Sequence, residues 1–240
     1  MNTSRAATAD TIPVLDLAAH ARALTECARC PRLVRHRESV GDDTYWARPV
    51  PGFGDESASL LVLGLAPGAH GANRTGRPFT GDAAGILLYR TLHVLGLATA
   101  EESVRRDDAL RLKGVWITNA VRCVPPANKP DARECARCAD WLQAELALLP
   151  VARVVVALGR TAHEAMLTQR QQATALRRRD YIFRHGARHV FPDGLLLHDC
   201  FHTSRYNVNT GRVNEEMVRT VFEAAARDAG LISKRQRLKT

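Results

Sequence analysis

Four short apolar runs constrain the fold more than any other feature of this chain. They are LLVLGL at 60–65, VWITNAV at 115–121, RVVVALG at 153–159 and LLLHDCF at 195–201. Runs that are apolar at nearly every position are typical of parallel strands covered on both faces of the sheet. Helical patterns separate the runs, at 82–97, 138–149 and 161–170. The alternation predicts an α/β fold, a three-layer α/β/α sandwich with a short, mostly parallel central sheet.

The length of 240 residues and the hydrophobic content of 45% suit one such domain, which we place at 14–231. Residues 1–13 and the basic tail 232–240 are predicted to be disordered. A first helix is expected from Asp16 to about Cys27, followed by an irregular segment to Ser59 that is interrupted by Pro and Gly. Residues 170–192 form a basic excursion, in the simplest case a solvated loop.

The formal net charge of +9 indicates a surface that attracts polyanions, so nucleic acid is a candidate partner. An arginine-rich composition from a GC-rich source is the alternative explanation. No apolar run approaches the roughly 18 residues that span a bilayer, and the first residues contain no hydrophobic signal segment. We therefore expect a monomeric cytoplasmic protein, associated with the nucleoid and not with a membrane, whose clustered cysteines are ligands rather than disulfides.

Distinctive polar strings follow three of the predicted strands. GLAPGAHGANRTGRPFTGD at 64–82 follows the first, Asn119 and Arg122 lie at the end of the second, and HTSRYNVNTGR at 202–212 follows the last. Because ligands bind beyond the carboxyl ends of parallel strands, these strings are expected to converge at one edge of the sheet. The glycine-rich string lacks the GK[ST] of a P-loop and the GxGxxG of a dinucleotide fold, so it does not indicate a nucleotide site.

The three strings resemble those of the family 5 (type b) uracil-DNA glycosylases and, more distantly, of the iron–sulfur family 4 enzymes. The resemblance extends from about Cys27 to Arg212. It implies the glycosylase α/β/α fold and a monofunctional enzyme that flips uracil out of double- or single-stranded DNA and hydrolyses its N-glycosidic bond, leaving an abasic site. It also implies activity on other deaminated or modified bases such as hypoxanthine. A non-enzymatic, metal-stabilised DNA-binding module would explain the charge and the cysteines, but not the residues at the strand ends.

An extruded base needs an aromatic surface, hydrogen bonds to its edge and stabilisation of the charge that develops on it. The resemblance assigns the stacking surface to Phe79, and Asn119 can offer both a donor and an acceptor to a pyrimidine. His202 can donate to the base oxygen that gains charge. Each has a structural alternative: a core phenylalanine, a turn or cap asparagine, a structural histidine. The remaining base contacts are assigned to the turn residues Gly64, Ala66 and Pro67.

Most branches of the superfamily carry Asp, Asn or Glu where this chain has Ala66, so the usual water-activating side chain is missing. Asn73 and Asp82 are the nearby candidates for holding the water, although Asp82 could equally cap the helix that follows it. Thr203 replaces the proline that commonly follows the histidine, which puts the stiffness of that loop in doubt. Contacts to the DNA are expected from the polar residues of the two strings: His70, Arg74, Arg77, Ser204, Arg205, Tyr206 and Asn207.

The cysteine spacing is Cys27-x2-Cys30, Cys123, and Cys135-x2-Cys138, with Cys200 in the last strand. By spacing alone, the two CxxC pairs make a four-thiolate zinc site plausible. The resemblance instead selects Cys27, Cys30, Cys123 and Cys138 as ligands of a structural [4Fe-4S] cluster. It leaves Cys135 and Cys200 as bystanders.

Overall fold

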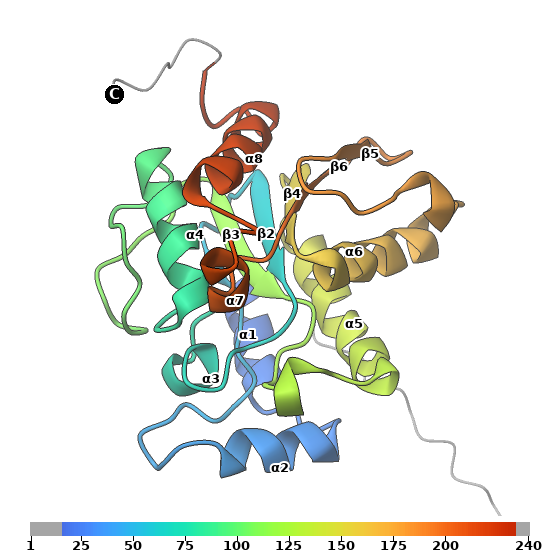
Figure 1. Cartoon of the computed structure of the whole chain (residues 1–240). Helices are drawn as coiled ribbons and strands as arrows, with labels where there is room; N and C mark the ends of the chain where they lie inside the picture. The colour runs from blue at the N-terminus through green and yellow to red at the C-terminus, as the bar shows by residue number, and fades with distance from the viewer. Residues whose placement is uncertain (1–15, 234–240) are drawn as a thin grey trace, which may run out of the picture.

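The computed structural model describes residues 16–233 as a three-layer sandwich (Figure 1). Its sheet has the order β1-β3-β2-β4-β6-β5. The four central strands are parallel to one another, and the two edge strands are antiparallel to their neighbours. The strands are β1 (Phe53–Gly54), β2 (Leu60–Gly64), β3 (Val115–Asn119), β4 (Val154–Leu158), β5 (Arg188–Val190) and β6 (Leu196–Cys200). The predicted fold class and its four strands are confirmed.

Helices cover both faces of the sheet because successive strand residues point in opposite directions. Leu60 and Val62 pack towards α4 (Ala83–Val94) and α8 (Glu215–Asp228). Leu61 and Leu63 pack on the opposite side. That side is covered by α1 (Leu17–Thr25), α5 (Ala132–Ala147) and α6 (Arg160–Ala173). The two apolar layers explain why all five residues of β2 are buried.

Smaller elements lie around the carboxyl edge of the sheet and below it in Figure 1. They are α2 (Pro31–Ser39), α3 (Ala72–Thr75), α7 (Arg205–Asn209) and the 3₁₀ turn η1 (Pro126–Asn128). A second 3₁₀ turn, η2 (Arg178–Asp180), follows α6 at the right of the view. The expectation that the chain is irregular up to Ser59 is therefore wrong in part, because this segment contains α2 and β1. Helix α2 begins with a proline at its first position, where the missing N–H has no helical partner to lose. Only Leu33 and Arg37 of this polar helix are buried.

Two other elements differ from the sequence-based expectation. Helix α5 begins six residues before Cys138, at a capping box in which Asp131 and Glu134 satisfy each other's backbone N–H groups. The segment 170–192 holds the end of α6, η2 and β5, so it is not simply a solvated loop. The termini expected to be disordered lie almost wholly outside the described residues. Within 16–233, no helix is both long and apolar enough to cross a membrane.

Candidate active site

A cavity of about 890 Å³ lies at the carboxyl ends of the central parallel strands. Phe79, Asn119 and His202, which come from three separate segments, all line it. The expected convergence of the strand ends is therefore present in the structure, as the parallel arrangement requires. The predicted site residues that line this cavity are Ala66, Phe79, Asp82, Asn119, His202, Ser204, Arg205 and Asn207.

Asn119 ends β3 beside Gly64, the last residue of β2. A Cβ atom built on Gly64 would lie 2.3 Å from Asn119 Oδ1 and 2.6 Å from Phe79 Cζ, so only glycine lets the amide and the ring approach this strand end. The Asn119 side chain is buried, and its Oδ1 accepts no hydrogen bond from any described residue. A buried acceptor without a partner costs about 1–3 kcal/mol. A ligand that donates a hydrogen bond would remove that cost.

Phe79 has a backbone φ of 55°, in the left-handed region that phenylalanine rarely adopts. A conformation of this kind costs on the order of 1–2 kcal/mol and persists only where its neighbours hold it. The neighbouring carbonyl of Pro78 accepts a 2.9 Å hydrogen bond from the Tyr89 hydroxyl. Burial raises the pKa of Tyr89 to about 12, so this hydroxyl keeps its proton. The ring of Phe79 is thereby fixed at the cavity wall.

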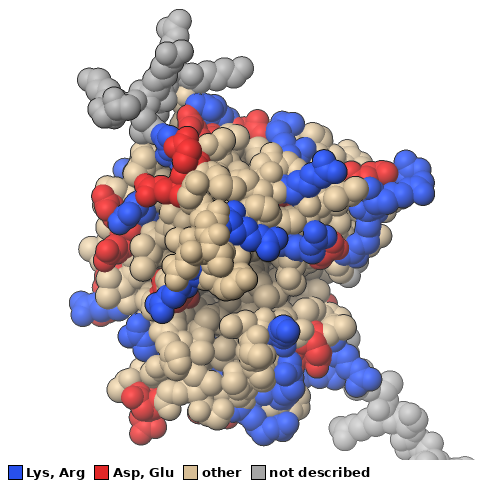
Figure 2. Space-filling view, viewed as in Figure 1, with Lys and Arg blue, Asp and Glu red and all other residues tan. Residues whose placement is uncertain are grey.

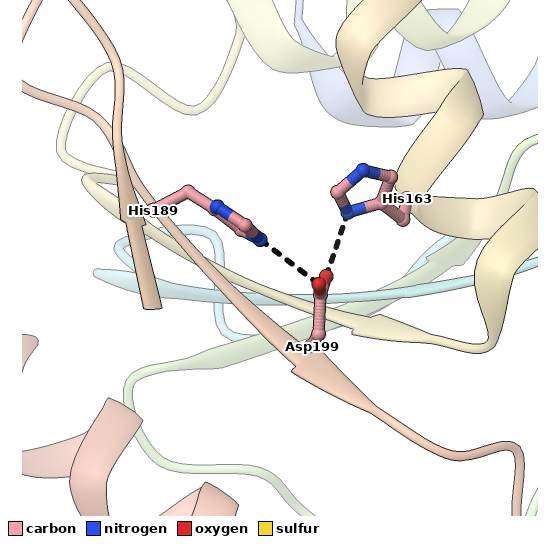
Figure 3. A group of neighbouring side chains, drawn as sticks. All are labelled: His163, His189 and Asp199. Atoms are coloured by element: carbon pink, nitrogen blue, oxygen red, sulfur yellow. Dashed lines mark hydrogen bonds and ion pairs between the residues drawn. The ribbon is translucent and has the colours of Figure 1, made fainter. Parts of the chain in front are cut away.

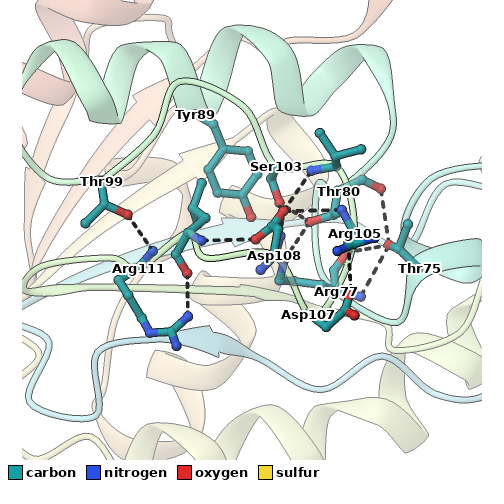
Figure 4. A network of polar contacts seen from close by, with 12 residues as sticks. Thr75, Arg77, Thr80, Tyr89, Thr99, Ser103, Arg105, Asp107, Asp108 and Arg111 are labelled. Carbon is teal, nitrogen blue, oxygen red and sulfur yellow. Dashed lines mark hydrogen bonds and ion pairs between the residues drawn. The ribbon is translucent and has the colours of Figure 1, made fainter.

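Arg77 belongs to the buried network drawn in Figure 4, which corrects the expectation that it contacts DNA. Only 2% of its surface is exposed. Its Nη2 donates to Asp108 Oδ2 at 2.5 Å and to Ser103 Oγ at 2.6 Å, and its Nε donates to Thr80 Oγ1 at 3.0 Å. Burial opposes ionisation of Asp108, but the hydrogen bonds from Arg77 and nearby backbone N–H groups outweigh it and lower the pKa of that carboxyl. Arg77 thus braces the turn that carries Phe79.

The His202 imidazole lies across the cavity from the stacking candidate. Its ring centroid is 6.3 Å from that of Phe79, and the two planes are inclined by 36°. Burial lowers the pKa of His202, and the nearby charge of Asp82 partly opposes this shift. A neutral ring therefore predominates at pH 7, and a neutral imidazole can still donate one hydrogen bond.

The two candidates for holding water are placed differently. Asp82 caps α4 by accepting a 2.9 Å hydrogen bond from Gly85 N at Oδ1, and the same carboxylate lines the cavity. Its two suggested roles are therefore geometrically compatible. Asn73 is fully buried, does not line the cavity, and donates through Nδ2 to the Arg37 carbonyl. The expectation that Asn73 holds the water is corrected: its side chain anchors α3 to α2.

The loop after β6 is held by hydrogen bonds rather than by a proline. Thr203 Oγ1 donates to the Ala84 carbonyl at 2.8 Å, which ties the loop to the start of α4. Asn207 Nδ2 donates to the His202 carbonyl at 2.8 Å, and Ser204 caps α7. The segment expected to contact DNA is thus a short helix, α7. Its Arg205 and Tyr206 side chains are exposed, Tyr206 by 73%.

The predicted site residues Pro67, His70 and Arg74 of the first string do not line the cavity. Pro67 is buried behind the wall, whereas His70 and Arg74 are exposed on the same turn. Arg74 Nε donates to the His70 carbonyl at 2.8 Å, which holds the two residues together. Both remain accessible to a ligand that approaches the cavity from this side.

Sequence reasoning missed one wall of the cavity. Phe183, Arg184 and His185 line it from the segment expected to be a solvated loop, and Arg160 and Arg212 flank them. Figure 2 shows that this face of the molecule is hollowed near its centre, with basic side chains at the border of the hollow. Two aromatic residues within the basic stretch YIFRHG were the available signal, because a solvated loop has no need of them.

Four cysteines surround a second, smaller cavity. It is lined by Cys27, Cys30, Cys123 and Cys138, while Cys135 and Cys200 do not line it. Burial raises the pKa of Cys123 to about 11 and that of Cys138 to about 12, so these thiols ionise only beside a compensating positive charge.

Hydrogen-bond donors already point at two of these sulfur atoms. Arg37 Nη1 lies 3.2 Å from Cys123 Sγ, and the backbone N–H of Arg122 lies 3.3 Å from Cys138 Sγ. Such donors are typical of the surroundings of metal thiolates. Ala66, which lines the large cavity, also packs against this cysteine cluster. The two sites therefore share one wall.

The distances between the cysteine sulfurs bear on the zinc site that the cysteine spacing in the sequence made plausible. A tetrahedral zinc ion with bonds of 2.3 Å holds its thiolates about 3.8 Å apart. Within residues 16–233, no three cysteine sulfurs lie within 4.8 Å of one another. A four-iron cluster binds each thiolate at a different iron and so requires wider spacing. The described cysteines are therefore not arranged as the ligands of one zinc ion.

Fold and cavity together define an α/β protein with a ligand site at the carboxyl edge of its sheet. The family model for the uracil DNA glycosylase superfamily matches residues 51–226, so the chain belongs to that superfamily. A type-5 uracil-DNA glycosylase from Thermus thermophilus is 52% identical over 224 residues, which cover 90% of this chain and 100% of the relative. A type-5 enzyme from Pyrobaculum aerophilum is 45% identical, covering 87% and 92%. A type-4 enzyme from Sulfurisphaera tokodaii is 27% identical, covering 73% and 74%.

Proposed function

We propose that this protein is a uracil-DNA glycosylase of base-excision repair, which extrudes uracil into the large cavity and hydrolyses its N-glycosidic bond. The unpaired Oδ1 of Asn119 is the observation that carries the proposal. Uracil offers an N3–H donor beside two carbonyl acceptors, which an amide with a free oxygen can recognise. The relatives named as type-5 uracil-DNA glycosylases support the same substrate. A DNA-binding module without activity would not need these groups in one cavity.

The cavity residues divide the reaction between them. Phe79 stacks on the base, and the Asn119 amide bonds to its edge. His202 donates to the base oxygen that becomes negative as the C1′–N1 bond breaks, which stabilises the leaving group. Asp82 holds the water that attacks C1′. Because Ala66 has no polar atom for this purpose, stabilisation of the departing base supplies a larger share of the rate.

The cavity is considerably larger than one pyrimidine, so we extend the proposal to hypoxanthine and other deaminated or modified bases. The reaction needs only water as nucleophile, so the protein is proposed to be monofunctional and to leave the strand uncut. The charge of +9 and the exposed Arg205, Arg74 and His70 favour contact with the DNA backbone.

Cys27, Cys30, Cys123 and Cys138 are proposed to hold a [4Fe-4S] cluster. When bound, the cluster would supply the positive charge that the four thiolates require and would pin α2 to the residues after β3. Hydrolysis transfers no electrons, so its role is structural. Through Ala66, the cluster region supports the wall of the base cavity.

A cleavage assay tests the proposal. End-labelled duplexes containing uracil, hypoxanthine or a normal base are incubated with enzyme and then divided, with one half treated with alkali to cut abasic sites. We expect alkali-dependent cleavage at uracil, and losses of about 100-fold or more in single-turnover rate for His202→Ala and Asn119→Ala. His93→Ala, a half-buried histidine at the end of α4 outside the cavity, is the matched control. Unchanged activity in both site variants would refute the assignment, and cleavage without alkali would refute monofunctionality.

A further inference from the structure

A second constellation of ionisable side chains lies in the core next to the base cavity. Asp199 in β6 accepts from His163 Nδ1 at 2.7 Å through Oδ1, and from His189 Nε2 at 2.9 Å through Oδ2 (Figure 3). The side chains of His163 and Asp199 are 0% exposed, and that of His189 is 11% exposed. The roles proposed for the cavity residues do not use any of the three.

His163 is bonded on both sides of its ring. Its Nε2 lies 3.0 Å from the Tyr181 carbonyl, while Nδ1 faces the carboxylate of Asp199. Both partners are acceptors, so the ring satisfies them together only as an imidazolium that donates from both nitrogens. Burial opposes ionisation of Asp199, but the hydrogen bonds from the two histidines outweigh it and lower the pKa of the carboxyl. The hydrogen bonds of the trio therefore hold the Asp199 carboxylate ionised in the core.

A metal ion is the other centre that such a trio could hold. Ligand bonds of about 2 Å to one ion place a nitrogen and an oxygen roughly 3 Å or more apart. The 2.7 Å separation of His163 Nδ1 and Asp199 Oδ1 is instead that of a charge-assisted hydrogen bond. A proton between them accounts for the geometry.

The trio attaches a specific stretch of chain to the sheet. Asp199 Oδ2 also accepts from the backbone N–H of Arg184 at 3.1 Å, and the Asp199 carbonyl accepts from Gly186 N at 2.8 Å. Together with the bond from His163 to Tyr181, these contacts fix residues 181–186, which we call the wall segment. The pairing of β5 with β6 begins at Arg188, so apart from the backbone bond of Gly186 it is side chains that tie the wall segment to β6.

The wall segment forms part of the base cavity. Its Phe183, Arg184 and His185 line the cavity, and Arg184 is exposed there. His185 Nδ1 accepts from the backbone N–H of Phe201, the residue before His202. An exposed guanidinium beside this cavity fits a phosphate group, which it can bind with paired hydrogen bonds.

We infer that the trio His163, Asp199 and His189 positions the wall segment so that Arg184 binds a backbone phosphate of the extruded nucleotide. The inference rests on the proposed function for the nature of the ligand. The three trio residues touch no substrate; they act through the position of Arg184. Loosening the trio should weaken DNA binding more than it slows the bond-breaking step, because Phe79, Asn119 and His202 all lie outside the wall segment.

Two variants loosen the trio. His163→Leu removes both hydrogen bonds of the buried ring, and His189→Gln is the milder change in case the first variant does not fold. His198→Gln is the matched control. His198 precedes Asp199 on β6 and bonds to Asp228 at 2.9 Å, so it is a buried histidine paired with an exposed aspartate on the opposite face of the same strand.

Single-turnover cleavage of a uracil duplex is measured over a range of enzyme concentrations, giving a half-saturation concentration and a maximal rate. We expect the half-saturation concentration to rise about tenfold in the trio variants, the loss of about one charge-assisted contact, with the maximal rate within roughly twofold. The control variant should match the wild type. Equal effects in the control, or a fall in maximal rate alone, would overturn the inference.

A double-mutant cycle tests whether the trio acts through Arg184. If it does, adding His189→Gln to Arg184→Gln weakens binding no further, whereas independent effects multiply. Fluorescence anisotropy of a labelled abasic duplex supplies the binding constants, and the slope of log Kd against log salt should fall by about one in each single variant. Multiplying effects or an unchanged slope would overturn the inference. If the wild type binds DNA with this pattern but cleaves no uracil, only the proposed function fails.

Discussion

Adding one methyl group at Gly64 tests the cavity geometry directly. The new Cβ in Gly64→Ala would lie 2.3 Å from Asn119 Oδ1 and 2.6 Å from Phe79 Cζ, whereas ordinary contacts begin at about 3.4 Å. The amide oxygen and the ring edge must therefore each move away from the new carbon by about 1 Å. Neither moves freely, because Asn119 is paired within the sheet and the Phe79 turn is bonded to Tyr89.

Both stability and rate should respond to this substitution. Overpacking of this kind lowers the free energy of unfolding by about 1–3 kcal/mol. A displacement of about 1 Å at the reacting geometry lowers the rate by on the order of 100-fold. Single-turnover cleavage of a uracil duplex with excess enzyme gives the rate, and urea unfolding gives the stability.

Gly96→Ala is the control for a strained glycine away from the cavity. Gly96 has a φ of +74° and no atom within 4 Å of an added Cβ, so its substitution costs on the order of 1 kcal/mol of stability without touching the site. Its cleavage rate should equal that of the wild type. If Gly64→Ala remains folded and cleaves within about threefold of the wild-type rate, the close approach of the amide and the ring is not what the reaction depends on.

Three further predictions concern the surroundings of the cavity. Arg77→Met leaves Asp108 half-buried without its partner, so urea unfolding should show a loss of about 3 kcal/mol; a loss below about 1 kcal/mol would contradict the bracing role. Cys30→Ser should purify with less iron and less visible absorbance than the wild type, and stoichiometric zinc in the wild type would contradict the cluster. The pKa of His202, followed by its ring resonances, should lie below 6.5 and fall further in Asp82→Asn, because the carboxylate opposes the effect of burial. A lowered histidine pKa means that the unfolded chain binds more protons, so stability should decline as pH falls below about 6.5; a rise there would contradict this sign.

The central sheet was predictable because its strands are buried on both faces. Continuous apolar runs of five residues, such as Leu60–Gly64, leave few alternatives when helical patterns separate them. The edge strands β1 and β5 have two and three residues, too few for any periodicity. Helix α2 was missed because it is polar and buries little, so its stability comes from tertiary contacts. One of these is the pair of hydrogen bonds from Arg32 to Glu134 in α5, at 2.8 and 2.6 Å.

The site was predictable to the extent that strand ends decide it. Asn119 and His202 had to meet at one edge because their strands run parallel. No comparable rule applies to the glycine-rich turn. Nothing in its sequence shows that Asn73 and Arg77 are buried while Arg74 is exposed. The wall segment was missed for a related reason. Its place depends on hydrogen bonds to Asp199, which lies more than ten residues further along the chain.

Buried polar networks support the cavity from several sides. The Arg77–Asp108 pair braces the turn of Phe79, and the Asp199 trio fixes the wall segment. A third buried pair, Arg122 with Glu145 at 2.6 Å, lies three residues beyond Asn119. Apolar residues of similar volume would often be as stable or more stable at such positions, so stability alone does not explain these networks. Directional bonds do explain them, because the proposed base extrusion and leaving-group stabilisation need donors and aromatic surfaces that are fixed before the substrate arrives. The networks are therefore best understood as preorganisation of the cavity, obtained at some expense in folding free energy.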